Sequence, residues 1–115
     1  MSALDDLTRL KHIQKSALQA ISFVQNRSRE DLENDEMLIL ALERLLEIIG
    51  EASNNISDDC KAKYSSIPWR QMKGMRNRLA HVYFEVDLDI VWQVVNHDLP
   101  SLLVEVNKVL AELDG

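Results

Sequence analysis

The residues best suited to chemistry gather in one short segment, Arg76 to Tyr83. Histidine is the side chain whose ordinary pKa lies nearest neutrality, so His81 can accept or donate a proton at cellular pH. Arg76 supplies a permanent cation with a planar fork of hydrogen-bond donors, which suits developing negative charge. A titratable ring close to a fixed cation therefore predicts acid–base chemistry on an anionic ligand.

Helical spacing decides which of these side chains share a face. At about 100° per residue, Asn77 and His81 stack, so the Asn77 amide can fix the orientation and tautomer of the ring. Arg76 and Tyr83 also share a face, but Arg76 and His81 lie roughly 140° apart around the helix. Two copies related by a two-fold axis would let each arginine approach the partner's histidine. The spacing therefore predicts a homodimer with a shared site.

Charge is segregated along the chain. The formal net charge is −6, which on average argues against nucleic-acid binding, yet residues 61–83 contain no Asp or Glu. The basic residues of this window are Lys61, Lys63, Arg70, Lys73, Arg76 and Arg78. The window is either a solvated surface or a patch that faces an anion, and we favour the anion. Lys73 and Arg78 are predicted to bind substrate, with Arg70 in a supporting role.

The elements that must position this segment are predicted to be helices. Apolar residues recur at three- and four-residue spacing over residues 3–26 and 35–56, and again after Asp87, a predicted helix cap. Pro68 predicts the start of a helix that runs to about Tyr83. Residues 57–64 are predicted to form a short helix or turn, and residues 26–35 a connecting turn. Pro100 predicts a kink or break near Asp98. The fold class is all-α: an up-and-down four-helix bundle with an additional short helix, forming one domain over residues 1–115.

The second predicted helix carries two further signals. Its apolar stripe is wide, which predicts burial on more than one side, partly by another subunit. Gly50 weakens a helix by about 1 kcal/mol relative to Ala, so its presence predicts a close approach by another group. Glu51 follows it and is a candidate to hold Arg76 or Arg78 in place, although with Glu43 and Glu47 it also forms a plain charged stripe.

Several classes of protein are disfavoured. The single Cys60 has no partner for a disulfide or a zinc site, and we expect neither a metal nor a cofactor. The acidic N-terminal residues do not fit a secretory signal, and no apolar run approaches the ~18 residues of a membrane span. We therefore expect a cytoplasmic protein without membrane contact. His12 and His97 are interpreted as surface residues.

The run from Arg76 to Tyr83 resembles the motif of the HepT toxins, a branch of the HEPN superfamily, in which an Arg, four residues, a His, one residue and a Tyr follow one another. Supporting matches are Ile49-Gly50-Glu51-Ala52, Ile67-Pro68-Trp69-Arg70, Met75-Arg76-Asn77 and Asp98-Leu99-Pro100. They occur in the order that the family has them, so the resemblance covers nearly the whole chain. Val82 stands where such sequences often have Gly, at a position that the motif leaves free.

The resemblance implies a HEPN-like fold and the toxin component of a type VII toxin–antitoxin system. Such a toxin is a metal-independent endoribonuclease that acts on single-stranded RNA as a homodimer, with Arg76 and His81 as catalytic residues and Asn77 as a supporting one. It also implies a cognate minimal nucleotidyltransferase as antitoxin, which transfers AMP units from ATP to Tyr83. The alternative is a catalytically silent helical module that docks a nucleotidyltransferase or a nucleotide through the same basic surface. The sequence separates the two poorly.

Overall fold

Helices make up the regular structure of the part of the chain that is described. The computed structural model describes residues 3–75 and 87–114, and no strand occurs among them. This confirms the predicted all-α class. The helices are α1 (Ala3–Phe23), α2 (Asp31–Asn34), α3 (Glu36–Asn54), α4 (Asp58–Lys63), α5 (Trp69–Lys73), α7 (Leu88–Gln93), the π-helical η2 (Val94–Asp98) and α8 (Leu99–Asp114).

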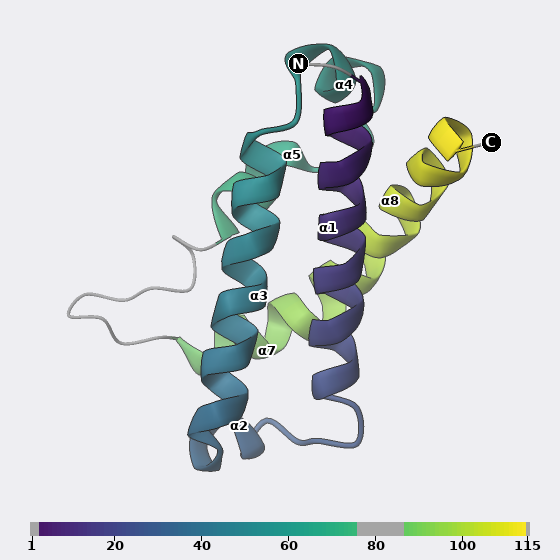
Figure 1. The fold of residues 1–115 in the computed structure, drawn as a ribbon. Helices are drawn as coiled ribbons and strands as arrows, with labels where there is room; N and C mark the ends of the chain where they lie inside the picture. The colour runs from purple at the N-terminus through teal and green to yellow at the C-terminus, as the bar shows by residue number, and fades with distance from the viewer. Residues whose placement is uncertain (1–2, 76–86, 115) are drawn as a thin grey trace.

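The centre of the fold is the antiparallel pair α1 and α3, which stand side by side (Figure 1). Leu10 and Ile13 of α1 are fully buried, as are Leu42, Leu46 and Ile49 of α3. Their three- and four-residue spacing places them on one face of each helix, and burial of such residues supplies most of the stability of a helix pair. The other elements are arranged around this pair, with α8 packed on α1 and α5 packed on α3.

The C-terminal helical segment, residues 88–114, has three parts, α7, η2 and α8. Proline has no N–H to donate to an α-helical ladder, and the π-helical turn ends two residues before Pro100. The helix is not broken near Asp98; the irregularity predicted there is a local change of helix type within a continuous helical segment. The segment passes behind α3 and α1, and α8 then runs obliquely beside α1, where the Gln14 amide donates to Asn107 Oδ1 at 2.7 Å (Figure 1).

The end of α1 and the segment after it differ in detail from their predictions, whereas residues 57–64 agree with theirs. The first predicted helix ends at Phe23, three residues early, and Asn26 has a φ of 61°, a left-handed conformation that asparagine tolerates better than most residues. Residues 26–35 were predicted as a turn, yet they include the short helix α2. Residues 57–64 do contain a short helix, α4, whose N-cap Ser57 accepts a hydrogen bond from the Cys60 amide at 3.2 Å.

The helix predicted from Pro68 to about Tyr83 begins as expected but is not continuous. Pro68 is the N-cap of α5, and Gly74 is its C-cap, with φ −85° and ψ 0°. The prediction of an uninterrupted helix is therefore wrong at Gly74, where the weak helix propensity of glycine favours a break. The remainder of the predicted helix, from residue 76, lies outside the described residues.

Candidate functional site

The motif itself falls within residues 76–86, which are not among the described residues. Five predicted site residues lie there: Arg76, Asn77, Arg78, His81 and Tyr83. The roles and the face-sharing predicted for them stay predictions. The structure does describe the chain on both sides of the motif, up to Met75 and again from Asp87, and these flanking residues show how the fold holds the ends of the segment.

On the N-terminal side, α5 approaches the backbone of α3 closely at Gly50. A Cβ atom built on Gly50 would lie 3.3 Å from the carbonyl oxygen of Met72 and 3.7 Å from that of Lys73. Beside this contact the buried Ser53 hydroxyl donates a hydrogen bond to the Gly50 carbonyl at 2.9 Å. The predicted close approach at Gly50 is confirmed. It fixes the last turn of α5 against α3 immediately before the chain enters the motif.

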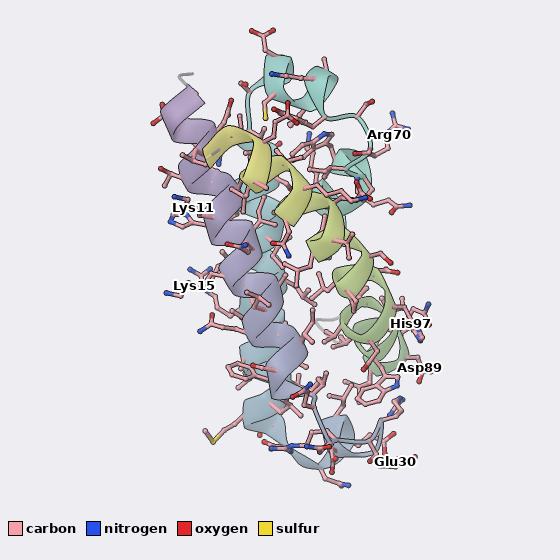
Figure 2. The ribbon with its side chains drawn as sticks, turned by 90° about the vertical axis from the view of Figure 1, so that its right-hand side faces the viewer. Lys11, Lys15, Glu30, Arg70, Asp89 and His97 are labelled. Carbon is pink, nitrogen blue, oxygen red and sulfur yellow. The ribbon has the colours of Figure 1, made fainter. Side chains whose placement is uncertain are left out.

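Helix α5 has one buried and one exposed face. Met72 of α5 is buried, as is Met75 just beyond its C-cap, and the Trp69 indole N–H donates to the Tyr64 carbonyl at 3.1 Å. Arg70 and Lys73 are exposed and lie three residues apart, so they share the outer side of α5. Figure 2 shows Arg70 projecting from the same side of the molecule as His97. Two of the predicted cationic residues are therefore presented to solvent beside the motif.

Glu51 is exposed and directly follows Gly50, so it lies next to the contact between α3 and α5. Its neighbour in the predicted charged stripe, Glu47, forms an ion pair with Arg44 at 3.1 Å. The pKa of Glu43 is raised, first by burial and then by the charge of Glu47. The proposed partners of Glu51, Arg76 and Arg78, are not among the described residues, so its supporting role stays a prediction.

On the C-terminal side, polar groups hold the chain where it leaves the motif. The Asp87 carboxylate accepts hydrogen bonds from the amides of Asp89 at 3.0 Å and Ile90 at 3.2 Å, which confirms the predicted cap. Arg29 then donates from Nε to Asp89 at 2.7 Å and from Nη1 to Glu33 at 2.9 Å. These two hydrogen bonds, with Asp89 the larger contributor, raise the pKa of Arg29. The start of α7 is thus tied to the segment that contains α2.

A cavity of about 300 Å³ opens between α5 and the junction of η2 with α8. Buried Met72, Met75 and Leu102 contribute its apolar wall. Its polar lining includes Gln71, His97, Asp98, Ser101 and Glu105. His97 is exposed, as interpreted from the sequence, but its place at this cavity was not predicted. Two runs that supported the family resemblance, Ile67-Pro68-Trp69-Arg70 and Asp98-Leu99-Pro100, each contribute a residue to this cavity.

Two kinds of site are absent from the described part of the chain. No three His, Cys, Asp or Glu side chains of residues 3–75 and 87–114 come together in a way that could hold a metal ion. Within the same residues, no helix is both long enough and apolar enough to cross a membrane.

Known proteins resemble this chain over most of its length. A protein of Methanocaldococcus jannaschii named "Putative RNase" is 38% identical over 109 residues, which is 95% of this chain and 100% of that protein. One from Thermococcus cleftensis named "Probable ribonuclease HepT" is 44% identical over 88 residues, 73% of this chain and 80% of its own. A "Putative RNase" of Caldanaerobacter subterraneus is 38% identical over 101 residues, 88% of this chain and 90% of its own. No solved structure gives a significant match.

The family described as Ribonuclease HepT-like matches residues 13–109. This span includes the motif, the contact at Gly50 before it and the Asp87 cap after it. This span is well over half of the chain, and it agrees with the resemblance carried by the motif from Arg76 to Tyr83. The protein therefore belongs to the HepT-like ribonuclease family.

Proposed function

We propose that this protein is a metal-independent endoribonuclease that cuts single-stranded RNA, and that it is the toxin of a toxin–antitoxin pair. The observation that carries the proposal is the family match over residues 13–109, which contains the intact pair Arg76 and His81. The exposed cations Arg70 and Lys73 beside the motif support it, because a polyanionic strand needs positive charge along its path.

The proposed reaction uses the ribose 2′-hydroxyl as nucleophile. His81 takes the proton from this hydroxyl, the 2′-oxygen attacks the adjacent phosphorus, and the bond from phosphorus to the 5′-oxygen breaks. A proton goes to the leaving oxygen, so the products are a 2′,3′-cyclic phosphate and a 5′-hydroxyl. Arg76 stabilises the negative charge that builds on the phosphoryl oxygens. DNA lacks the nucleophile and is not cut by this route.

We further propose that each active site takes Arg76 from one copy and His81 from the other copy of a homodimer. The basis is their five-residue spacing on a predicted helix, which places them on different faces. Lys73 and Arg78 would bind the strand, with Asn77, Arg70 and Glu51 positioning the catalytic pair and the phosphates.

Regulation is proposed to act at Tyr83. A cognate minimal nucleotidyltransferase would transfer AMP from ATP to the Tyr83 hydroxyl, with release of pyrophosphate. Each AMP adds bulk and negative charge beside a site that binds phosphate, which blocks RNA by repulsion and by occupancy.

The test of shared catalysis is complementation between two inactive variants. Arg76→Ala and His81→Ala should each lose most cleavage of single-stranded RNA in EDTA. When the two variants are co-expressed and their dimers are purified together, they should recover about a quarter of wild-type activity, because about half of the dimers pair one variant with the other and each of those carries one intact site out of two. Mixed dimers that stay inactive would contradict the shared site, and full activity in His81→Ala would favour the catalytically silent binding module.

A charge-matched pair of variants tests the RNA path. Arg70→Ala and Lys15→Ala each remove one exposed positive charge, but Lys15 lies on α1, on the side of the molecule away from Arg70 (Figure 2). Arg70→Ala should raise KM for RNA while Lys15→Ala leaves KM unchanged. An equal rise for both would mean that only overall charge matters.

A further inference from the structure

The cavity between α5 and the junction of η2 with α8 has the size and lining of a small-ligand site. Its volume of about 300 Å³ lies at the lower end of the range for small-molecule pockets, roughly 300–1,000 Å³, so it fits one planar group and not a length of nucleic acid. Met72 lines it from α5, Met75 lines it from just beyond the C-cap of α5, and Leu102 lines it from α8. Methionine is adaptable and polarisable, which suits contact with the face of an aromatic ring.

The polar lining selects among possible ligands. Asp98 and Glu105 contribute carboxylates, which repel phosphate and accept hydrogen bonds; Glu105 also pairs with Lys108 at 3.4 Å, and a carboxylate has lone pairs for further donors. His97 adds a ring that can donate or accept a hydrogen bond. Gln71 and Ser101 add groups that both donate and accept. A neutral ring that carries N–H donors at its edge matches this lining, whereas a bare anion does not.

The cavity also lies next to the proposed path of RNA. Met75, which lines it, is the residue directly before Arg76 of the motif. Arg70 and Lys73 project to solvent from the same short helix that supplies Gln71 and Met72. Phosphates that follow these cations would leave a base free to turn into the cavity, as proteins that read single-stranded RNA commonly arrange.

We propose that this cavity binds one nucleobase of the RNA and prefers guanine, so that it sets the sequence at which the enzyme cuts. Guanine presents an exocyclic amino group and an adjacent ring N–H, a pair of donors that one carboxylate can accept together. Uracil offers a single N–H between two carbonyl oxygens, which face the carboxylates unfavourably. This inference rests on the proposed ribonuclease function.

Base binding can be measured without catalysis. Methionine methyl groups labelled with ¹³C report on Met72 and Met75, and Met37, which is 81% exposed at the start of α3, serves as an internal control. Addition of GMP should shift the Met72 and Met75 methyl signals and leave Met37 in place. The dissociation constant for GMP should be about tenfold below that for UMP, a difference of about 1.4 kcal/mol, because guanine makes a bidentate hydrogen-bond pair that uracil cannot make.

A matched pair of variants connects the cavity to cleavage. Ser101→Trp places an indole at the cavity from an exposed position, whereas Val104→Trp adds the same side chain to the same helix at a residue that does not line it and is 53% exposed. Ser101→Trp should abolish the GMP-induced shifts and the guanine preference of the cut sites in a mixed-sequence RNA. Val104→Trp should retain both, and helical circular dichroism checks the folding of each.

The outcomes separate the two proposals. Methyl shifts that are absent, or equal for GMP and UMP, overturn the base pocket even if RNA is cut. Guanine-selective shifts in a protein that cuts no RNA support the pocket and overturn the proposed ribonuclease function. Cut sites whose base preference is the same in Ser101→Trp and in wild type show that specificity is set elsewhere.

Discussion

The two ends of the motif are held by different kinds of interaction. Before it, α5 is fixed by backbone packing, with the Met72 carbonyl 3.3 Å from the position of a Cβ on Gly50. After it, α7 is fixed by polar contacts, the Asp87 cap and the pair between Arg29 and an Asp89 side chain that is 81% exposed. A closely packed contact does not depend on charge screening, but it has no space for a larger side chain. An exposed ionic contact has space for a larger side chain, but dissolved salt screens its charges. One end of the motif is thus more rigidly defined than the other.

The largest effect should come from adding volume at the packed end. Gly50→Val would force side-chain atoms against the α5 backbone, and such overpacking costs about 1–3 kcal/mol of the free energy of unfolding. Urea denaturation measures this cost. Gly74→Val is the matched control, because a Cβ there meets its nearest atom at an ordinary 3.5 Å. If both valines cost the same, close packing at Gly50 is not what distinguishes this end.

Removal of the cap at the other end should have an intermediate effect. Asp87→Ala leaves the Asp89 and Ile90 amides without their acceptor, and loss of an N-cap costs about 1 kcal/mol. Hydrogen exchange at these two amides should accelerate more than exchange in α3. Asp87→Asn retains an acceptor oxygen and should behave like wild type, and an Asn variant as unstable as the Ala variant would show that charge, and not capping, is required.

The smallest effect should come from the ion pair. Arg29→Ala and Asp89→Ala should each destabilise the protein slightly, and a double-mutant cycle should give a small favourable coupling at low salt, as is typical of exposed pairs. That coupling should vanish in about 1 M salt, where the screening length is roughly 3 Å. A coupling that persists at high salt would mean that the polar end is held as firmly as the packed one.

Periodicity was sufficient to predict the long elements of the fold. The apolar spacing located α1, α3 and the helical segment that starts at Asp87, because each buries one continuous face. It missed α2, since four residues are too few to show a period. It also predicted that the third helix continues through Gly74, but the helix ends there because glycine has a weak preference for helical backbone.

The candidate site was predictable only where its residues are close in sequence. The motif from Arg76 to Tyr83 and the contact at Gly50 were found from short runs and from one unusual glycine. The cavity joins Gln71 to Ser101, which are 30 positions apart and have no common pattern. Such a site depends on how α5 and α8 pack together, and packing of distant elements leaves no periodic signal in one sequence.

The π-helical turn at Val94–Asp98 makes the C-terminal segment tolerant of the loss of one residue. A π turn holds one more residue than an α-helical turn, so deletion of one residue there leaves a regular α-helical turn. Because the wide turn absorbs the extra residue, the helix beyond it keeps its orientation relative to α7 after the deletion. Leu102, Val106 and Val109 then stay on the buried side of α8. A single deletion elsewhere in α8 has no wide turn to absorb it and rotates the residues beyond it by about 100°, away from the core.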